Sequence, residues 1–247
     1  MNICDLHTHT IASGHGTRDT ITDLAKAAAA RGLAMLGVTD HGPATPGAAA
    51  VSYFRALPDV PRGRFGVRIL CGAEVNILEG GELDLPAEVL DRLDYCVASM
   101  HHPPRRRKKP GEDAAPVKAR NTEDYVKALA DPHVRILGHF DRTQFDAELD
   151  AVLDACAAHR VLLEINNLSL SDEGWHDEPG ISAKDRIRET LLAAKRRRLA
   201  VILSSDSHGA AGVGLMPFAE AMAAEVSYPE ELIANRNPHL LAYYLAR

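Results

Sequence analysis

A chain of 247 residues, 46% hydrophobic and 25% charged, has the composition of an ordinary globular protein that can bury a sizeable core. Its net charge of −6 argues against a dedicated binder of duplex nucleic acid, and no apolar run approaches the roughly 20 residues of a membrane span. Because no basic segment followed by an apolar one opens the chain, we expect no signal peptide and a cytoplasmic location. Cys4, Cys71, Cys96 and Cys156 lie in apolar runs without CxxC spacing, which predicts free buried thiols.

Short apolar runs alternate with helical patterns along the chain. Strands are expected at Asn2–Leu6, Leu33–Thr39, Val67–Ala73, Asp94–Met100, Val134–Gly138, Val161–Ile165 and Ala200–Ser204. Three helices stand out at Thr20–Arg31, Asp146–His159 and Ser182–Arg198. The first has a capping box of Thr20 with Asp23 and a stop at Gly32. Strands joined by helical crossovers are parallel, and near-continuously apolar strands suit a sheet covered on both faces.

Histidine and acidic residues recur where these strands are expected to end. They are His7 and His9, His41, Glu74, His101, His139, and Asp206 with His208, after strands one to five and seven respectively. Seven of the twelve histidines, His15 included, lie at or just beyond a strand end, which chance clustering explains poorly. A closed barrel brings its carboxyl strand ends together, whereas an open sheet spreads them along a line. The pattern therefore predicts one α/β barrel domain over residues 1–247 with a metal site at that end.

The same residues give the chain a resemblance to a known family. The motifs are Asp5-Leu6-His7-Thr8-His9-Thr10, His15, Thr39-Asp40-His41-Gly42, Gly72-Ala73-Glu74-Val75-Asn76, Met100-His101-His102-Pro103, Leu137-Gly138-His139, Glu164-Ile165-Asn166-Asn167 and Ser204-Ser205-Asp206-Ser207-His208. In this order they resemble the polymerase and histidinol phosphatase (PHP) family of metallo-phosphoesterases, particularly its stand-alone, YcdX-like phosphatases. The resemblance implies a distorted (β/α)7 barrel with three divalent metal ions, commonly zinc, with manganese or iron as alternatives.

The resemblance also implies how the ligands are shared among the metals. His7, His9 and Asp206 would hold the first metal, Glu74 would bridge it to a second held by His101 and His139, and His15, His41 and His208 would hold the third. Either His101 or His102 could ligate, and we choose His101 because it directly follows the apolar run. The chain departs from the family's Ser-His-Pro pattern at Gly138-His139-Phe140-Asp141, so the turn after this ligand is expected to differ.

Other residues near these positions have two readings each. Asp5, Asp40 and Glu164 could orient the histidines or simply cap strand ends, and Asp40 is the better candidate for orientation. The basic segment 103–120 is expected to be a loop beside the site, where Arg105, Arg106 and Arg107 would either clamp a phosphate or remain solvated. In the loop 169–180, Trp175 and His176 could border the mouth of the site.

Clustered divalent cations favour hydrolysis of a phosphate ester by a metal-activated water, which requires no serine or cysteine nucleophile. We therefore predict a hydrolase of phosphoric monoesters of small metabolites, with no general acid assigned. The alternatives are a phosphodiesterase or exonuclease, and a non-catalytic, metal-stabilised binding module. The expected partner is a small phosphorylated substrate, with no dedicated nucleic-acid binding and no membrane; the sequence leaves the oligomeric state open.

Overall fold

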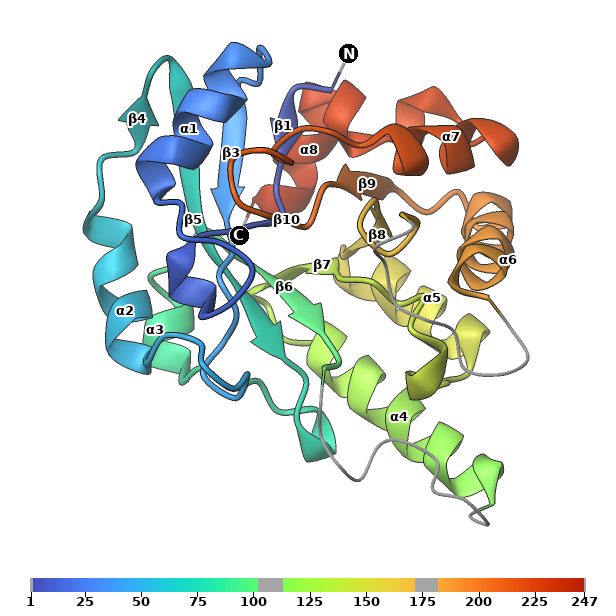
Figure 1. Cartoon of the computed structure of the whole chain (residues 1–247). Helices are drawn as coiled ribbons and strands as arrows, with labels where there is room; N and C mark the ends of the chain where they lie inside the picture. Colours follow the sequence, from blue (N-terminus) through green and yellow to red (C-terminus); the bar gives the residue numbers. More distant parts are fainter. Residues whose placement is uncertain (1, 102–112, 172–181, 247) are drawn as a thin grey trace.

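The computed structural model describes residues 2–101, 113–171 and 182–246, in which a nearly closed sheet of parallel strands is surrounded by helices (Figure 1). The strands follow the order β1 (Cys4–Asp5), β3 (Met35–Val38), β5 (Val67–Asn76), β6 (Tyr95–Ser99), β7 (Val134–Leu137), β8 (Leu162–Asn166) and β9 (Val201–Ser204). Every neighbouring pair in this order is parallel, and only the short β4 (Gly63–Arg64) runs antiparallel, to β5. The predicted distorted (β/α)7 barrel is confirmed.

The barrel closes through two short strands that continue its first and last members. β2 (Thr8–His9) follows β1, β10 (Ser207–His208) follows β9, and the two pair in parallel with His208 opposite His9. Nearer the start of the strands, the amide of Asn235 bridges the seam. Its Nδ2 donates to the carbonyls of Cys4 (3.1 Å) and Leu203 (2.8 Å), and its Oδ1 accepts from Leu203 N (2.7 Å). One buried side chain therefore provides hydrogen bonds of the kind that a strand pair would provide.

Helices cover the outer face of the sheet, except that the last helix packs against the apolar cluster on the barrel axis. They are α1 (Ile21–Ala30), α2 (Val51–Ala56), α3 (Ala87–Leu90), α4 (Ala114–Leu129), α5 (Leu149–His159), α6 (Ala183–Arg196), α7 (Pro217–Glu225) and α8 (Pro238–Leu245). The predicted capping box is present at α1, where Asp23 Oδ2 accepts from Thr20 N at 3.0 Å. Among the described residues, none of the helices combines the length and the apolar character needed to cross a membrane.

The structure corrects three predicted boundaries. The first predicted strand, Asn2–Leu6, is shortened to β1, and the separate strand β2 follows it at positions predicted to lie beyond the strand end. β5 extends to Asn76 because Asn76 pairs with Ser99 and Glu74 bridges to His41, so Glu74 lies within its strand and not after it. The loop predicted over 103–120 is wrong for its last part. α4 begins at Ala114, capped by Asp113, and Pro116 falls in the first turn, where a helix does not need its N–H.

Alternate residues of each strand face the helices or the barrel axis. Near the beginning of the strands the axis is filled by an apolar cluster of Cys4, Leu6, Leu70, Tyr95, Val97, Ile136, Leu162, Ala200, Ile202, Ala234 and Leu241, the last from α8. The Tyr95 hydroxyl donates to Leu6 O at 2.6 Å. Gly37 leaves the space for this hydroxyl, since a Cβ at position 37 would lie 1.9 Å from the hydroxyl oxygen of Tyr95. All four cysteines are free and buried, as predicted.

Candidate metal centre

The predicted ligands gather at the carboxyl end of the barrel. His9 lies on β2, Glu74 on β5 and His208 on β10, while His7 lies between β1 and β2 and Asp206 between β9 and β10. His41, His101 and His139 follow within three residues of the ends of β3, β6 and β7, respectively. Seven of these side chains are buried and that of His208 is half-buried, whereas His15, on the loop after the 3-10 helix η1 (Ile11–Ser13), is exposed. Segments from the whole length of the chain thus meet at one point.

The carboxylate of Glu74 lies in the middle of the cluster. Its Oε1 is 2.8 Å from His139 Nε2, 3.1 Å from His101 Nε2 and 3.4 Å from His7 Nε2. Its Oε2 is 2.5 Å from His41 Nδ1 and 3.6 Å from His9 Nε2. A carboxylate with both oxygens surrounded by imidazole nitrogens can hold two cations side by side.

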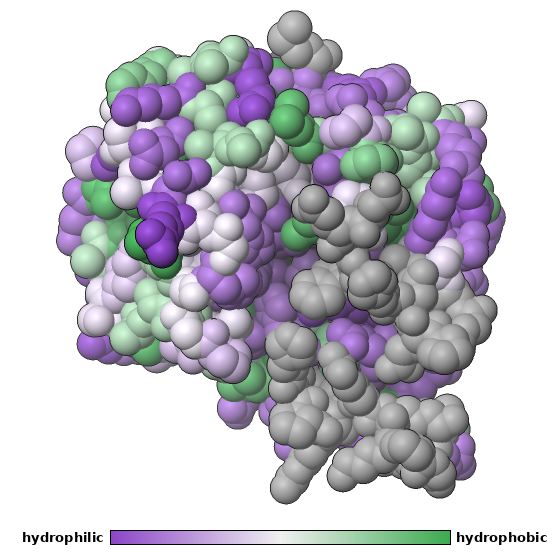
Figure 2. Space-filling view, in the orientation of Figure 1, coloured by the Kyte–Doolittle hydropathy of each residue, from purple (hydrophilic) through white to green (hydrophobic). Residues whose placement is uncertain are grey.

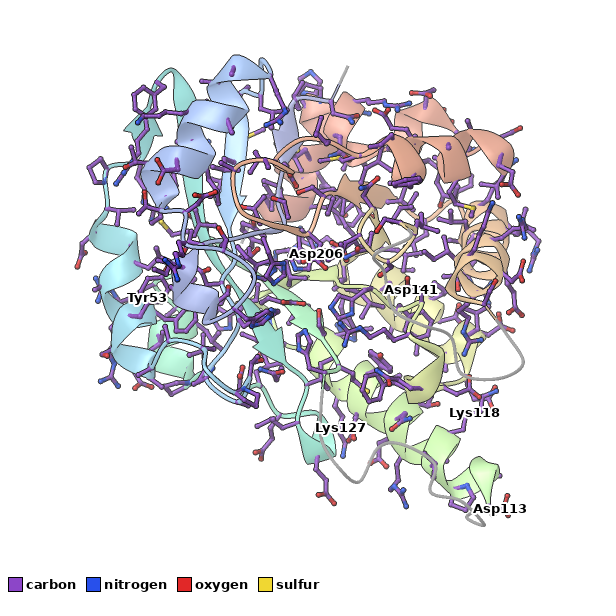
Figure 3. The ribbon with its side chains drawn as sticks, viewed as in Figure 1. Tyr53, Asp113, Lys118, Lys127, Asp141 and Asp206 are labelled. Carbon is purple, nitrogen blue, oxygen red and sulfur yellow. The ribbon has the colours of Figure 1, made fainter. Side chains whose placement is uncertain are left out.

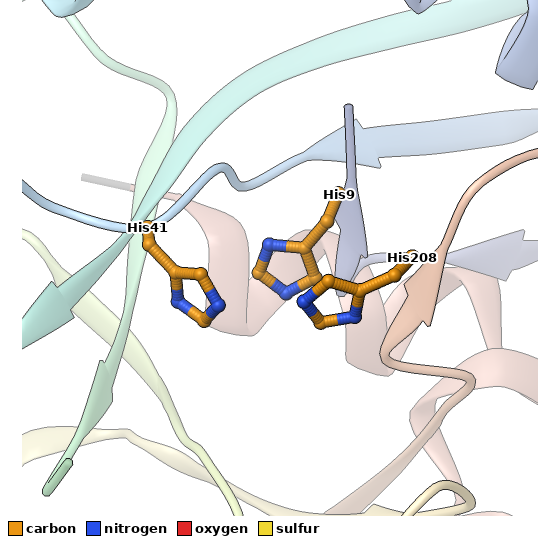
Figure 4. Close-up of side chains that lie close together, drawn as sticks. All are labelled: His9, His41 and His208. Carbon is orange, nitrogen blue, oxygen red and sulfur yellow. The ribbon is translucent and has the colours of Figure 1, made fainter. Parts of the chain in front are cut away.

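Three groups in the described residues bring their ligand atoms within 4.8 Å of one another: His7 with His9 and Asp206, His9 with His41 and His208, and His41 with Glu74 and His101. Figure 4 shows the rings of His9, His41 and His208, which come from three different segments and face a common space. The centroid of the His15 ring lies 4.9 Å from those of His41 and His208; the ring is stacked on His41 and tilted relative to His208. His102 lies outside the described residues.

The inner atoms of the cluster are buried and lie close together, but among the described residues none of them makes a hydrogen bond with suitable angles. They are His7 Nε2, His9 Nε2, His41 Nδ1, Glu74 Oε2, His101 Nε2, Asp206 Oδ1 and His208 Nε2. Burying a polar atom without a partner costs free energy, and so many together require an explanation. Imidazole nitrogens and carboxylate oxygens are donors that zinc, manganese and iron accept, so the set fits divalent metal ions.

The outer nitrogens of three rings are held by neighbouring side chains. Nδ1 lies 2.6 Å from Glu164 Oε1 in His7, 2.9 Å from Ser13 Oγ in His9, and 2.7 Å from Asn76 Oδ1 in His101. A partner on Nδ1 fixes the ring orientation and directs Nε2 inward, as in metal sites. Asn76 and Ser13 had no predicted role; each is a polar residue close to a ligand strand, which is too common a pattern to single them out.

Glu164 and Asp40 reach the ligands by different routes. Glu164 contacts His7 directly, and its Oε2 accepts from His139 N at 2.7 Å. Asp40 accepts from Ser13 Oγ at 2.7 Å and from Tyr53 OH at 2.5 Å, so it reaches His9 only through Ser13. Tyr53 lies on α2, outside the cluster (Figure 3).

Asp5 contacts backbone and hydroxyl groups near the ligands. Its carboxylate accepts from Ser205 Oγ at 2.5 Å, from Ser205 N at 3.2 Å and from Gly214 N at 2.7 Å. Desolvation raises the pKa of Asp5, although these hydrogen bonds counteract the increase. Asp5 therefore ties the segment that carries Asp206 to the loop before α7.

The electrostatics of the cluster favour charged carboxylates. Burial opposes their charge, yet His101, His41 and His7 hold the pKa of Glu74 well below its ordinary value. His7 and His9 similarly keep the pKa of Asp206 well below its usual range, against desolvation. Burial and the neighbouring His41 lower the pKa of His9 well below normal, which keeps that ring neutral. Ionised carboxylates and a neutral imidazole are the protonation states in which these groups bind metal.

The turn after β7 contains two charged residues, Asp141 and Arg142, that had no predicted role in the site. Gly138 leaves room for Ser99, since a Cβ would lie 2.3 Å from its Oγ, and His139 adopts a positive φ of 28°. Asp141 and Arg142 follow His139 and are buried. Burial lowers the pKa of Arg142, and the negative charges of Glu74, Asp141 and Asp206 oppose that change. Arg142 therefore brings a positive charge to the cluster.

Several earlier candidates fall on residues that the structure does not describe. They are Arg105, Arg106, Arg107, Trp175 and His176. In the described part of this face, Figure 2 shows hydrophilic residues around the middle, with hydrophobic residues scattered among them.

The fold and the cluster define an α/β barrel with metal-ligating side chains at the carboxyl ends of its strands. The PHP domain model matches residues 5–168. A probable phosphatase from Clostridium acetobutylicum is 35% identical over 248 residues, covering 98% of this chain and 94% of the relative. A probable phosphatase from Caldanaerobacter subterraneus is 35% identical over 247 residues, covering 98% and 91%. The chain therefore belongs to the PHP domain family.

A solved structure shares the fold at lower identity. Histidinol phosphate phosphatase from Lactococcus lactis, crystallised with zinc, L-histidinol and phosphate, matches with a TM-score of 0.59 and 18% identity. The match covers 92% of this chain and 95% of that protein, so almost the complete barrel has a counterpart.

Proposed function

We propose that this protein is a metal-dependent phosphatase that hydrolyses phosphoric monoesters of small metabolites. The observation that carries the proposal is the set of seven buried ligand atoms without hydrogen-bond partners. The names of the relatives support the phosphatase activity, and the zinc, histidinol and phosphate of the Lactococcus lactis structure support the metal and the substrate class.

In this proposal nine residues hold three divalent metal ions, with zinc as the first choice. They are His7, His9, His15, His41, Glu74, His101, His139, Asp206 and His208. Support comes from the central position of Glu74 and from the three groups with closely spaced ligand atoms. His15 is the ligand with the weakest support, because it is exposed and reaches the cluster by ring stacking alone.

The residues around the ligands have separate tasks in the reaction. When bound, divalent ions supply Lewis acidity towards phosphate oxygens and lower the pKa of a water molecule, so that hydroxide is available at neutral pH. Glu164 and Ser13 hold the rings of His7 and His9 in place. Arg142 places a positive charge near the reaction centre, where it would stabilise the charge that develops on the phosphoryl oxygens.

The test is to measure metal content and phosphate release on the same protein. We expect about three metal ions per chain and hydrolysis of monoesters, both strongly reduced in His7→Ala and Asp206→Asn. The control is His239→Ala, an exposed histidine on α8, which should change neither quantity. Failure to bind zinc, manganese or iron refutes the proposal. Full metal occupancy with cleavage of diesters alone identifies a phosphodiesterase, and occupancy without hydrolysis identifies a binding module.

A further inference from the structure

A cavity of about 810 Å³ adjoins the metal cluster and has two chemically different walls. One wall is formed by Asp206, His208 and the exposed His15. The other contains Leu215 and Phe218, which are 48% and 45% exposed. A single large apolar side chain that is exposed needs no explanation. Two that line the same cavity beside the predicted metal-ligating residues indicate a binding surface.

Hydrogen bonds fix the apolar wall to the strand ends that carry the ligands. Asn167 Oδ1 accepts from Phe218 N at 2.9 Å and from Ala219 N at 3.3 Å, and so caps the beginning of α7. The preceding Asn166 donates to Asp206 Oδ2 at 3.0 Å. Asp5 accepts from Gly214 N on one side of the cavity and from Ser205 on the other. The distance between the apolar wall and the ligands is therefore set by the scaffold, which preorganises the cavity.

The charge of the cavity restricts what can enter it. Among its described lining residues the histidines and Asp206 are the ionisable groups, and no lysine or arginine is present. Within this described lining, a second phosphate or a carboxylate would meet no cation away from the metal cluster, whereas an aryl or alkyl group would cover Leu215 and Phe218. Desolvating an unpaired anion costs far more than burying an apolar group.

We propose that this cavity receives the alcohol part of the substrate and selects monoesters whose alcohol has an aryl or alkyl body and no second anionic group. This inference rests on the proposed phosphatase function and adds the substrate class to it. Leu215 and Phe218 act as specificity residues, and they touch the alcohol and not the phosphoryl group.

The test compares ligands that share the anionic head and differ in the apolar body. We expect the metal-loaded protein to bind phenylphosphonate more tightly than methylphosphonate by calorimetry. We also expect kcat/KM for phenyl phosphate to exceed that for glycerol phosphate. In Leu215→Ala/Phe218→Ala both preferences should fall about tenfold, while methylphosphonate binding and metal content stay unchanged. Leu192→Ala on α6 and Tyr243→Ala on α8 are matched controls, since both side chains are also partly exposed and lie outside this cavity.

The two proposals fail in different ways. If the wild-type protein releases phosphate but shows no preference for phenyl ligands, or if the double variant keeps that preference, the specificity inference is wrong and the phosphatase function stands. If the metal-loaded protein binds neither phosphonate and releases no phosphate from any monoester, both proposals are refuted.

Discussion

The two ends of the barrel are built from the same strands, but their buried polar groups differ in number and in hydrogen bonding. At the beginning of the strands the axis is apolar, and the buried polar groups of Tyr95 and Asn235 have hydrogen-bond partners. At the carboxyl end, Leu70 gives way to Glu74 four residues later on β5, and Leu162 gives way to Glu164 two residues later on β8. There, buried nitrogens and oxygens face one another without partners.

This difference indicates that the two ends of the same strands have different roles: one stabilises the fold, and the other forms the candidate metal centre. The apolar end contributes the free energy of folding through burial of side chains, and it does not depend on any ligand. The carboxyl end stores unfavourable interactions, because carboxylates and imidazoles are desolvated together. A bound cation would relieve that cost, and the free energy of metal binding would then appear as stability.

The largest effect should come from removing metal from the carboxyl end. If the ions bind at a thousandfold excess over Kd, a single site contributes about 4 kcal/mol, so loss of even one ion should lower the melting temperature by roughly 10 °C, and chelation of all of them by more. Calorimetry with and without a chelator, followed by zinc addition, measures this change. If protein shown to have lost its metal keeps its melting temperature, the desolvated carboxylates and imidazoles do not cost the free energy of folding that we infer.

The apolar end should respond to Asn235→Ala. This change leaves the Leu203 N–H and the carbonyls of Leu203 and Cys4 without their partner at the barrel seam. We expect unfolding to become easier by about 3 kcal/mol in urea, with metal affinity nearly unchanged. The matched control is Asn237→Ala, which removes the cap of α8 and should cost about 1 kcal/mol. Equal losses in the two variants would show that the seam has no special role.

The smallest effect on stability should come from Glu164→Gln, which separates orientation from folding. A glutamine keeps the shape but replaces the charged partner of His7 Nδ1. We expect metal affinity to fall roughly 10- to 100-fold in a chelator competition, with the free energy of unfolding of the metal-free protein lowered by less than about 1 kcal/mol. Glu88→Gln, at an exposed ion pair with Arg55, is the control. Unchanged affinity would mean that Glu164 serves the fold alone.

The succession of strands along the chain, and the residues that the structure gathers at their carboxyl ends, could be predicted because both depend on local patterns. Apolar runs followed by His41, His101 or His139 can be read directly from the chain. The extent of β5 could not be read in this way, because it depends on pairing with Ser99 and His41, which are distant in sequence. α4 was partly missed because its basic, proline-containing beginning resembles a loop.

Residues that act from other elements were also beyond local patterns. Asn235 belongs to a polar stretch near the C-terminus, and nothing in its neighbourhood reveals that it spans β1 and β9. Arg142 appears in the sequence as an ordinary charge after His139, and only the tertiary fold buries it beside Glu74 and Asp206. The hydroxyl of Tyr53, on α2, donates to Asp40, and no local pattern around Tyr53 reveals this contact.

Because β2 pairs with β10, the candidate metal centre can form only after the last segment of the barrel has been made. His9 and His208 face each other across that pair, so the first and the last segments of the barrel must dock before their imidazoles can meet. A ribosome-bound chain that still lacks residues 206–247 has His7 and His9 but neither Asp206 nor His208. Bringing such remote segments together is the slow, entropically expensive part of folding. During synthesis, full metal loading would therefore come last and mark a finished molecule.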